Sequence, residues 1–477
     1  MNVADQETSQ LYQKRIPIFT RSVKGKFRTF KWATMALAYG VYFLLPWLPW
    51  QRGHEAPSQS VLFDLPGRKF YLFDLVVYPQ DIFWLSLLLF IAGALLFFAT
   101  GLIGRAFCGY FCFQTLWTDA FIAIEKLVQG ERPARQRLYK QPWNREKILK
   151  LSLTHSLWLL LAFWTAFTFI LYFSYAPELF VRFMGGKASN IAYFTVLIIT
   201  ATTYVAAGWA REQVCLYMCP YARFQGVMYD PETLAVAYDS RRGEGEAGRA
   251  VPRAGFRTQE ERKSKGHGDC IDCKLCIQVC PTGIDIRKGL QYQCIACGLC
   301  IDACNSMMDS MSYPRGLIRY DSEANLALPV PAKPRLHWKS PKVIGWGIAL
   351  LVMTIWLINS IGHRSNLDAT VQQIRQPLFT TLSDGKIRNR YQVRITNKSV
   401  EDESYVISSR GLPEHALEMG NFSEVKVHAG KSLIIQAGVS LLPKQAESTH
   451  NFEFVVTPRT FPDQALQLGT RFDFKHE

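Results

Sequence analysis

The stretches CIDCKLCIQVCP (residues 270–281) and CIACGLCIDACN (residues 294–305) decide how the centre of this chain folds. Each stretch carries four cysteines in the spacing C-x2-C-x2-C-x3-C. In this arrangement three closely spaced thiolates wrap one [4Fe–4S] cluster, and the fourth thiolate reaches across to the neighbouring cluster. The spacing therefore predicts a bacterial-type 2[4Fe-4S] ferredoxin domain at about residues 265–312, which would act as an electron relay.

The crossing arrangement assigns four ligands to each cluster. The first cluster is predicted to bind Cys270, Cys273, Cys276 and Cys304, and the second Cys294, Cys297, Cys300 and Cys280. The alternative is a structural zinc site, which pairs two C-x2-C motifs separated by about 12 to 20 residues. A third cysteine, repeated in both halves, has no use in such a site, so we favour the clusters.

The composition of the 477-residue chain places these cysteines in a membrane protein. Hydrophobic residues make up 49% of the chain, while its formal net charge is +15. The Lys and Arg residues cluster beside apolar runs, which argues for membrane lipid and against nucleic acid as a partner. A membrane span takes about 20 apolar residues. Five segments meet this requirement: residues 32–50, 82–104, 151–175, 188–210 and 343–361.

The distribution of Lys and Arg predicts the orientation of these spans, because basic residues favour cytoplasmic loops. Residues 1–31 carry seven and residues 105–150 carry nine, whereas residues 51–81 carry three and residues 176–187 carry two. We therefore expect the N-terminus, the loop 105–150 and the long loop 211–342 in the cytoplasm. The chain after the fifth span would then be periplasmic.

The segments outside the spans differ in character. Residues 240–268 are charged and rich in Gly, which predicts a flexible tether. The C-terminal residues 365–477 alternate apolar and polar side chains within NRYQVRITNKS, EVKVHAGKSLIIQAG and HNFEFVVTPR. This pattern predicts an Ig-like β-sandwich. The expected domain plan is a cytoplasmic N-terminus (1–31), four membrane helices (32–210), the cytoplasmic ferredoxin loop, a fifth membrane helix and the sandwich.

Two further cysteine pairs follow the second and fourth expected spans, at their cytoplasmic ends. GRAFCGYFCFQTLW contains Cys108 and Cys112, and REQVCLYMCPYARFQG contains Cys215 and Cys219. A spacing of four places two thiols one turn apart on a helix, so two such helices side by side would bring four sulfurs together. Soft thiolates select Cu(I), zinc or an iron–sulfur centre. The alternative is four buried, inert cysteines.

Two details of these helices stay open. Phe113 follows the first pair, whereas Pro220 follows the second, so the two pairs are not identical. His155 lies near the start of the third expected span, and an ionisable group inside a membrane span is a functional candidate. The alternative for His155 is a single polar contact without a ligand role.

Together these motifs resemble the CcoG/FixG-type cytochrome c oxidase accessory proteins, essentially from end to end. The resemblance is carried by RSVKGKFR, CGYFC followed by QTLWTD, VCLYMCPYARFQGVMYD, the two cysteine quartets and YPRGLIRYDSE. It implies a multi-pass protein of the bacterial inner membrane that supports assembly of a cbb3-type oxidase. It further implies a cupric reductase, which takes Cu(II) to Cu(I) and handles copper with Cys108, Cys112, Cys215 and Cys219. The implied partners are the oxidase assembly machinery or copper-transport proteins.

Two other functions stay open. One is a membrane subunit that relays electrons from quinol to another acceptor, and the other is a redox-sensing scaffold whose sandwich docks the nascent oxidase. The sequence contains neither a C-x-x-C-H haem site nor a Gly-rich dinucleotide fingerprint. The electron donor is therefore unknown. A homodimer is also open, because two copies would combine their cysteine pairs.

Overall fold

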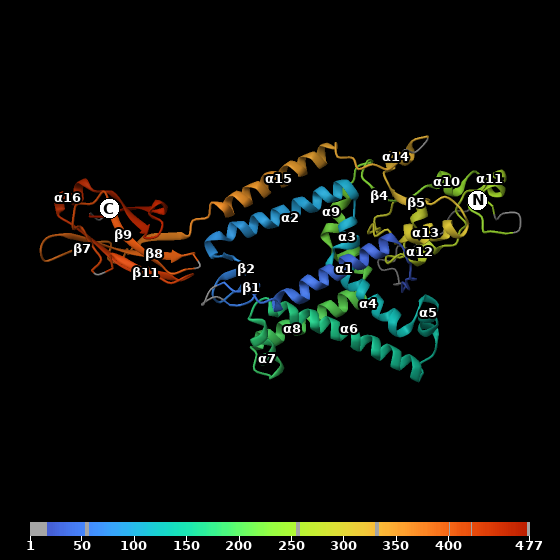
Figure 1. The fold of residues 1–477 in the computed structure, drawn as a ribbon, viewed down its shortest axis with the longest axis horizontal. Coiled ribbons are helices and arrows are strands. Elements are labelled where there is room, and N and C mark those ends of the chain that lie inside the picture. Colours follow the sequence, from blue (N-terminus) through green and yellow to red (C-terminus); the bar gives the residue numbers. More distant parts are fainter. Residues whose placement is uncertain are drawn as a thin grey trace, which may run out of the picture. The chain divides into compact units, whose positions relative to one another are not determined.

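The computed structural model describes residues 17–52, 57–253, 258–329, 333–399, 401–420 and 422–474. The chain divides into two compact units (Figure 1). Unit 1 comprises residues 1–46, 86–172 and 176–354, and unit 2 comprises residues 47–85, 173–175 and 355–477.

Unit 1 contains most of the helices. The longer and membrane-associated ones are α1 (Lys26–Leu44), α2 (Ile82–Ile103), α3 (Ala106–Tyr110), α4 (Phe113–Gln129), α5 (Arg132–Lys140), α6 (Arg145–Leu171), α7 (Ala176–Met184), α8 (Asn190–Thr203), α9 (Pro220–Met228) and α15 (Pro341–Gly362). Helix α8 continues into a π-helix, η3 (Tyr204–Ala210), and a second π-helix, η4 (Val214–Met218), follows it. A 3-10 turn, η1 (Leu45–Trp47), extends α1.

In the described part of the chain, five helical segments are long and apolar enough to cross a membrane. They are Ile82–Ile103, Ala106–Gln129, Arg145–Leu171, Asn190–Ala210 and Pro341–Gly362. Four of them correspond to expected spans. The expected span 32–50 is not among the five, because Arg28 and Lys31 lower the hydropathy of α1, which ends at Leu44.

The segment Ala106–Gln129 takes its place, although the sequence analysis assigned it to a cytoplasmic loop. The acidic residues Asp119 and Glu125 are buried in α4, and both are paired with cations from other elements. Such pairing lowers the cost of placing a carboxylate in an apolar setting, and it cannot be seen in one stretch of sequence.

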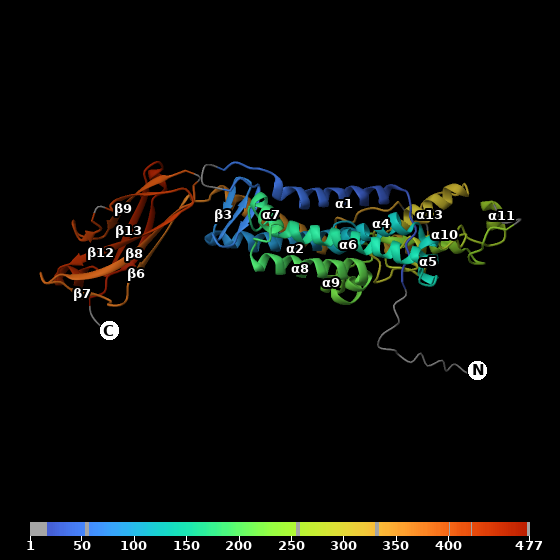
Figure 2. The same cartoon turned by 90° about the horizontal axis from the view of Figure 1, so that it is seen from below.

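Aromatic side chains hold the helices of unit 1 together. Phe121 of α4 stacks on Trp158 of α6 with ring centroids 5.3 Å apart. The Trp117 indole donates a hydrogen bond of 2.8 Å to the Thr165 hydroxyl, which also joins α4 to α6. Helices α2 and α15 lie side by side (Figure 1), and α6 packs along α8 (Figure 2).

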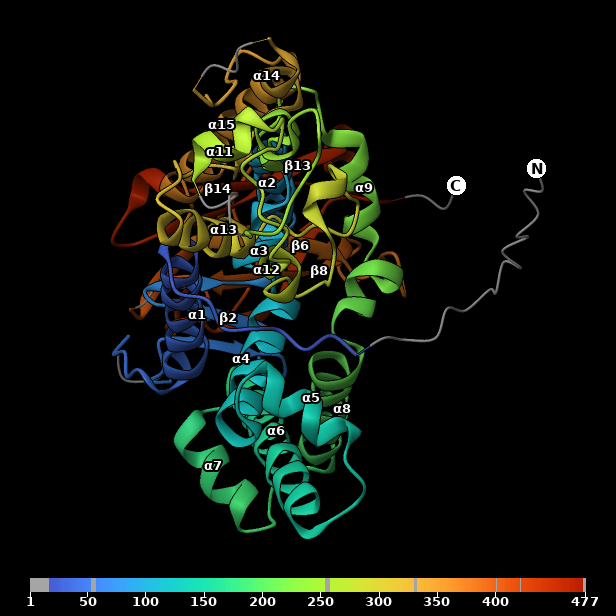
Figure 3. The ribbon, with the colours of Figure 1, turned by 90° about the vertical axis from the view of Figure 1, so that its right-hand side faces the viewer.

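The cysteine-rich part of unit 1 is closed by a two-stranded antiparallel sheet. Strand β4 (Ala235–Tyr238) precedes the quartets and pairs with β5 (Ile318–Asp321), which follows them. The folded region therefore extends beyond residues 265–312 on both sides. Helices α12 and α13, which pack together, face the viewer in Figure 3. The helices of this region are α10 (Ser240–Glu244), α11 (Gln259–Ser264), α12 (Leu275–Gln278), η5 (Ile286–Lys288), α13 (Leu299–Ser310) and α14 (Glu323–Ala327).

The expected tether over residues 240–268 is instead folded wherever the structure describes it. The side chain of Arg262 is fully buried and donates hydrogen bonds to the carbonyl oxygens of Gly268 at 2.8 Å and Cys270 at 3.0 Å. A β-bridge joins Gly245 to His267. The prediction of a tether was wrong because it required apolar residues for folding, whereas a buried guanidinium and backbone carbonyls organise this segment.

Unit 2 contains a small antiparallel sheet of β1 (Val61–Asp64), β2 (Lys69–Leu72) and β3 (Leu75–Val77), which the sequence analysis did not predict. Its main part is the predicted β-sandwich. One sheet has the order β10-β12-β8-β6, with β7 also pairing with β8, and the other has the order β11-β9-β13-β14. The elements are β6 (Leu367–Gln373), β7 (Thr380–Thr381), β8 (Ile387–Asn397), β9 (Glu403–Arg410), β10 (Leu417–Glu418), β11 (Glu424–Val427), β12 (Ser432–Leu441), α16 (Pro443–Ser448), β13 (Asn451–Pro458), η6 (Pro462–Gln464) and β14 (Leu466–Arg471).

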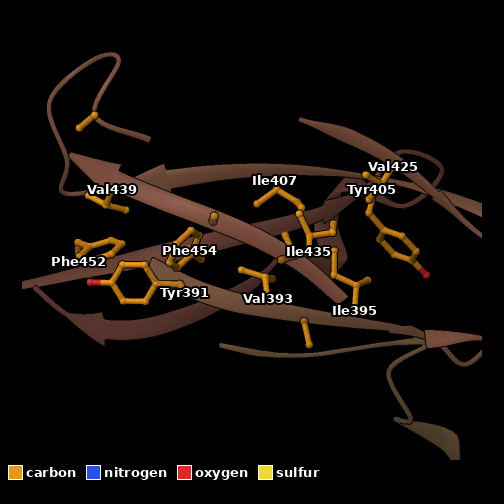
Figure 4. Packing of buried hydrophobic residues seen from close by; sticks show 14 of the residues in the cluster. Tyr391, Val393, Ile395, Tyr405, Ile407, Val425, Ile435, Val439, Phe452 and Phe454 are labelled. Carbon is orange, nitrogen blue, oxygen red and sulfur yellow. The ribbon is translucent and has the colours of Figure 1, made fainter. Parts of the chain in front are cut away.

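The core of the sandwich follows from strict alternation along its strands. On β13, Phe452, Phe454 and Val456 are buried, while the residues between them are partly exposed. Tyr391 from β8 packs edge-on against Phe452 with ring centroids 5.4 Å apart. Figure 4 shows these side chains meeting between the two sheets, as expected for alternate residues that point to one face of a strand.

Candidate functional site

Two small cavities lie inside the cysteine-rich region, one for each predicted ligand quartet. The first is lined by Cys270, Cys273, Cys276 and Cys304. The second is lined by Cys280, Cys294, Cys297 and Cys300, and Cys276 also reaches it. The first cavity thus receives three thiols from one stretch and one from the other, and the second receives three from one stretch and two from the other. The residues present therefore fit two [4Fe–4S] clusters held in the crossing arrangement.

The two cysteine stretches share an unusual backbone. Asp272 and Ala296 occupy equivalent positions and have φ values of 50° and 51°, and the next pair, Lys274 and Gly298, has values of 57° and 71°. Left-handed residues in a turn direct successive backbone N–H groups into a concave surface that favours anions and iron–sulfur sites. At Gly298 a side chain would also meet the ring of Phe27 at 2.6 Å, so close packing requires glycine there.

The protonation of these thiols depends on their burial. Burial raises the pKa of Cys276, Cys294 and Cys304 to about 12 each. Metal ligation requires thiolates, so iron would have to displace these protons. Among the described residues, no three His, Cys, Asp or Glu side chains lie close enough to share a single metal ion.

The N-terminal segment is attached to the cysteine-rich region through Asp302, which sequence reasoning did not single out. This carboxylate is buried in α13 and accepts hydrogen bonds from the backbone N–H groups of Phe27 at 3.3 Å and Arg28 at 2.8 Å. It therefore caps the first turn of α1 from another domain. A side chain at Gly25 would meet the Asp302 carboxyl group at 2.2 Å, which explains the glycine in RSVKGKFR.

Helix α5 also contacts this segment. The Arg132 guanidinium donates a hydrogen bond of 2.8 Å to the Phe19 carbonyl, and the Arg21 N–H donates one of 2.8 Å to the Gln278 carbonyl. The N-terminal segment, helix α5 and the cysteine-rich region are thus joined within unit 1.

The second cavity adjoins α3. The Tyr110 hydroxyl donates a hydrogen bond of 2.9 Å to the Cys297 carbonyl, and the Arg105 guanidinium donates one of 2.5 Å to the Tyr292 carbonyl. A side chain at Gly109 would lie 2.8 Å from the Ile295 oxygen, so the backbones approach closely there. The glycine and tyrosine in CGYFC mark this contact, although the sequence alone does not reveal their partner.

Both C-x3-C pairs lie where a helix is interrupted. Cys108 lies within α3 and Cys112 at the N-cap of α4, while Cys215 lies within η4 and Cys219 at the N-cap of α9. The chain is extended at the second cysteine of each pair, with ψ values of 129° and 112°. The expectation of two thiols one turn apart on a continuous helix was therefore wrong. π-Helices such as η4 occur frequently at functional sites.

The interruption also explains the residue after each pair. Pro220 and Phe113 occupy the first position of α9 and α4, respectively. Proline is favoured at this position because the backbone N–H that it lacks would have no partner within the helix. Phenylalanine is equally compatible with the break, and Phe113 stacks on Trp117 with ring centroids 3.9 Å apart.

Three of the four thiols of these pairs interact electrostatically with one another. Burial raises the pKa of Cys215 to about 11, and the nearby thiols of Cys112 and Cys219 raise it further. These three cysteines therefore lie near one another. Cys108 instead packs against Ile295 and other residues around the second cavity. The structure brings together cysteines from both pairs, although not all four in one cluster.

A third, polar cavity separates Cys215 from the second cluster cavity. It is lined by Cys215, Glu212, Arg211, Gln114, Thr115, Thr118, Ile122, Lys31, Asp119, Pro281, Thr282 and Ile295. The hydroxyl of Thr282 lies 3.3 Å from the Cys280 sulfur, so this cavity reaches from one predicted cluster ligand to Cys215. We call it the polar chamber.

Buried ion pairs surround the polar chamber. Asp119 accepts a hydrogen bond of 2.9 Å from Arg28 and lies 3.6 Å from the Lys31 ammonium group. Glu125 pairs with Arg135 at 3.0 Å and with Arg211, which precedes the second cysteine pair. Buried charges require such partners. Each of these two buried carboxylates is paired with two cations, and these residues carry no separate motif in the sequence.

His155 makes a polar contact, as in the alternative to a ligand role that the sequence left open. Its Nδ1 lies 2.9 Å from the Tyr204 hydroxyl, and its ring stacks on Trp209 with centroids 5.8 Å apart. Both partners belong to η3, so His155 joins α6 to the π-helix. In the described part of the chain it belongs to no group of metal-ligating side chains.

The fold and the site together define a membrane-bound iron–sulfur protein with a C-terminal Ig-like domain. Residues 210–323 match a family model described as a 4Fe-4S dicluster domain, and residues 357–474 match one described as the IG-like fold at the C-terminus of FixG. Protein RdxB of Cereibacter sphaeroides is 42% identical over 429 residues, which cover 88% of this chain and 87% of RdxB. The chain belongs to the FixG family.

A second curated relative is also similar, and one solved structure matches a part of the chain. The nitrogen fixation protein FixG of Rhizobium meliloti is 39% identical, covering 84% of this chain and 81% of that protein. The crystal structure of a FixG-related protein from Vibrio parahaemolyticus covers 24% of this chain and 100% of that chain, with 18% identity and a TM-score of 0.20. The family matches confirm the predicted ferredoxin and Ig-like domains, so the protein is an iron–sulfur oxidoreductase of this family.

Proposed function

We propose that this protein is a membrane-bound reductase that takes Cu(II) to Cu(I) and thereby supports copper delivery and assembly of a cbb3-type oxidase. The observation that carries the proposal is the position of the polar chamber. It lies between Thr282, beside the predicted ligand Cys280, and Cys215, whose neighbours are two further thiols. An electron source and soft sulfur atoms are thus adjacent.

When bound, the two [4Fe–4S] clusters supply single electrons, and each Cu(II) substrate ion accepts one to become Cu(I). Cys215 receives the substrate together with its neighbours Cys112 and Cys219, which would have to come closer together around the ion than they lie in the structure. Thiolates favour Cu(I) over hard cations. Because the pKa of Cys215 is raised to about 11, copper binding must release its proton. Glu212, which lines the chamber, is the nearest candidate acceptor for that proton. Cys108 supports the second cavity from the side of α3.

The proposed setting is the inner membrane, with the cysteine-rich region in the cytoplasm and the sandwich in the periplasm. The basic residues of segment 1–31 and of residues 130–144, which lie between two candidate spans, favour the cytoplasm. Arg21 of the first segment contacts Gln278 of the cysteine-rich region, and Arg132 of the second contacts Phe19 of the first, which agrees with a common side. Oxidase assembly proteins or copper-transport proteins are the proposed partners, and a separate protein or quinol supplies the electrons.

The decisive experiment compares Cys215→Ser/Cys219→Ser with the wild type. The protein is purified anaerobically, reduced with dithionite, freed of excess reductant and mixed with Cu(II), while a chelator traps Cu(I). We expect both proteins to retain about eight irons, as two [4Fe–4S] clusters require. Only the wild type should form Cu(I), and its visible cluster absorbance, which was lost on reduction, should return as the clusters are oxidised.

The matched control is Tyr217→Ser/Met218→Ser, which changes two exposed side chains of the same π-helix. This control should reduce Cu(II) at the wild-type rate. Undiminished Cu(I) formation by the cysteine variant would refute the assigned site. A wild type whose reduced clusters stay stable in Cu(II) would instead indicate a relay that serves another acceptor.

A further inference from the structure

An open groove of about 1460 Å³ lies in the β-sandwich of unit 2. Typical pockets for small molecules have volumes of about 300 to 1,000 Å³, so this groove suits a longer ligand. Its walls are formed by parts of β6, β8, β9, β13 and β14 and by the residues that follow β6. The lining residues used below are Gln372, Arg375, Arg410, Glu453, Gln467, Gly469 and Arg471.

The groove runs along two sheet edges. Within the described residues, β6 pairs only with β8, and β14 pairs only with β13, so each ends its own sheet. The two edge strands nevertheless lie close to each other across the open side of the sandwich. An edge strand presents backbone N–H and C=O groups to which another extended chain can pair.

A glycine in the middle of β14 supports close approach of a second backbone. Gly469 is exposed, and a side chain added there would meet no atom within 4 Å. Glycine weakens a strand interior, so its presence often marks a place where a ligand or another backbone comes near. Here packing within the described part of the protein supplies no other reason for the glycine.

The charge of the groove identifies the kind of chain that it fits. Its charged lining residues are Arg375, Arg410, Arg471 and Glu453. Arg471 lies 3.5 Å from Asp473, whereas Arg375 and Arg410 form no ion pair among the described residues. Both guanidinium groups are exposed, and the groove carries an excess of positive charge. Arginine pairs readily with carboxylates, often through two parallel hydrogen bonds.

We propose that this groove binds an extended, acidic segment of another protein, which adds to β14 as a further strand. Backbone hydrogen bonds to β14 would provide affinity, and carboxylates that meet Arg375 and Arg410 would provide selectivity. The sandwich is then a docking module for a partner protein. This inference does not depend on copper reduction, because it concerns unit 2 alone.

The test uses the full-length protein in its native membrane with a photo-crosslinking amino acid at Gln372 or Gln467, which lie on the two walls. We expect both positions to capture the same segment of a different protein, and that segment to be acidic. A third position, Lys426, serves as the control. It lies on β11, the opposite edge of the sheet that contains β14, and should not capture this segment.

Three variants measure the role of charge and shape. Arg375→Glu/Arg410→Glu should lower the yield of this product at least about tenfold, since it replaces two attractive pairs with repulsive ones. Arg394→Glu/Lys444→Glu makes the same change in net charge at exposed positions outside the groove and should leave the yield unchanged. Gly469→Trp should block the groove without altering the thermal unfolding of the protein, because its surroundings are open.

Several outcomes would overturn the proposal. They are the absence of a product at both wall positions, capture of a second copy of this chain, and capture of a segment that is not acidic. Equal losses in the groove variant and in the charge-matched control would have the same meaning. If the arginine variant fails to fold, Gly469→Trp decides the question, and an unchanged yield with this variant excludes strand addition at β14.

Discussion

The two cluster cavities are built from nearly the same sequence, yet they have different surroundings. Both stretches share the cysteine spacing and the left-handed residues at equivalent positions. The first cavity is bordered by Arg287, Lys274 and Met307 from its own domain. The second contacts α3 through Tyr110 and borders the polar chamber. A duplicated motif thus gives two sites whose roles are set by their neighbours, and only the second lies beside the paired cysteines.

The largest expected effect comes from removing one cysteine ligand from each quartet in turn and comparing the two variants. Cys273→Ser removes a ligand of the first quartet, and Cys294→Ser removes a ligand of the second. Each variant should lower the iron content from about eight to about four per chain. After chemical reduction, Cys273→Ser should still form Cu(I), whereas Cys294→Ser should form none. Iron analysis and chelator-trapped Cu(I) provide the readout, and equal losses would show that both cavities are needed at the copper step.

A second prediction tests the contact between α3 and the second cavity. A Cβ atom at Gly109 would lie 2.8 Å from the Ile295 oxygen and 2.9 Å from the Cys297 Cα. Both neighbours are backbone atoms, so Gly109→Ala should cost about 1 to 3 kcal/mol, as overpacking does. The measurement is the loss of cluster absorbance during thermal or denaturant unfolding in detergent.

The matched control for this prediction is Gly93→Ala in α2, where a Cβ atom meets nothing within 4 Å. The control should gain up to about 1 kcal/mol, since alanine favours helices more than glycine does. If both variants shift in the same direction, the close approach of α3 does not contribute to stability.

A third prediction concerns Asp302 of α13. It lies between Cys300, which lines the second cavity, and Cys304, which lines the first. Asp302→Ala removes the acceptor for two N–H groups of α1 and should lower the free energy of unfolding by about 0.5 to 2 kcal/mol. Asp309→Ala on the same helix is the control, because Asp309 is exposed and pairs with Arg315. A larger loss in the control would contradict the capping role.

The smallest expected effect is a difference in acid stability. The hydrogen-bonded Arg287 holds the pKa of Asp285 below its usual value, and Arg287 also pairs with Asp272 beside the first cavity. A carboxyl group with a lowered pKa in the folded state stabilises that state above its unfolded pKa, and this stability is lost as the pH falls through the folded pKa. Below about pH 4, the first cluster should therefore be released before the second.

Asp285→Asn tests this order. The substitution removes the titrating group, so the two clusters should then be released at more similar pH values. Spectra recorded at stepwise lower pH measure the release. An unchanged order in the variant would show that another group controls the acid stability of the first cavity.

The elements that could be predicted from the sequence are those whose information is local. The quartets, the apolar helices and the alternating strands of the sandwich all carry repeated patterns, and the family matches confirm the ferredoxin and Ig-like domains. The ligand assignment remains a prediction, although the structure gathers Cys304 with the first stretch and Cys280 with the second. This exchange of one cysteine between the two stretches is what the C-x2-C-x2-C-x3-C spacing predicts.

The features that were missed depend on partners far away in the sequence. Segment 106–129 contains Asp119 and Glu125, and it resembled a loop because their distant cationic partners, Arg28 and Arg211, are not visible in that stretch. Residues 240–268 fold around Arg262 rather than around apolar side chains. The break at Cys112 and Cys219 is a backbone property that the spacing of four does not encode. The polar chamber is likewise formed by residues from four distant segments.

The carboxylate of Asp302 has a consequence for the order of biosynthesis. Its partner N–H on Arg28 lies 274 residues earlier in the chain. Helix α1 therefore leaves the ribosome long before the carboxylate that caps it. Until α13 has been made, the N–H groups of Phe27 and Arg28 bind water instead of Asp302. The first turn of the N-terminal helix is therefore capped only after the cysteine-rich domain has folded.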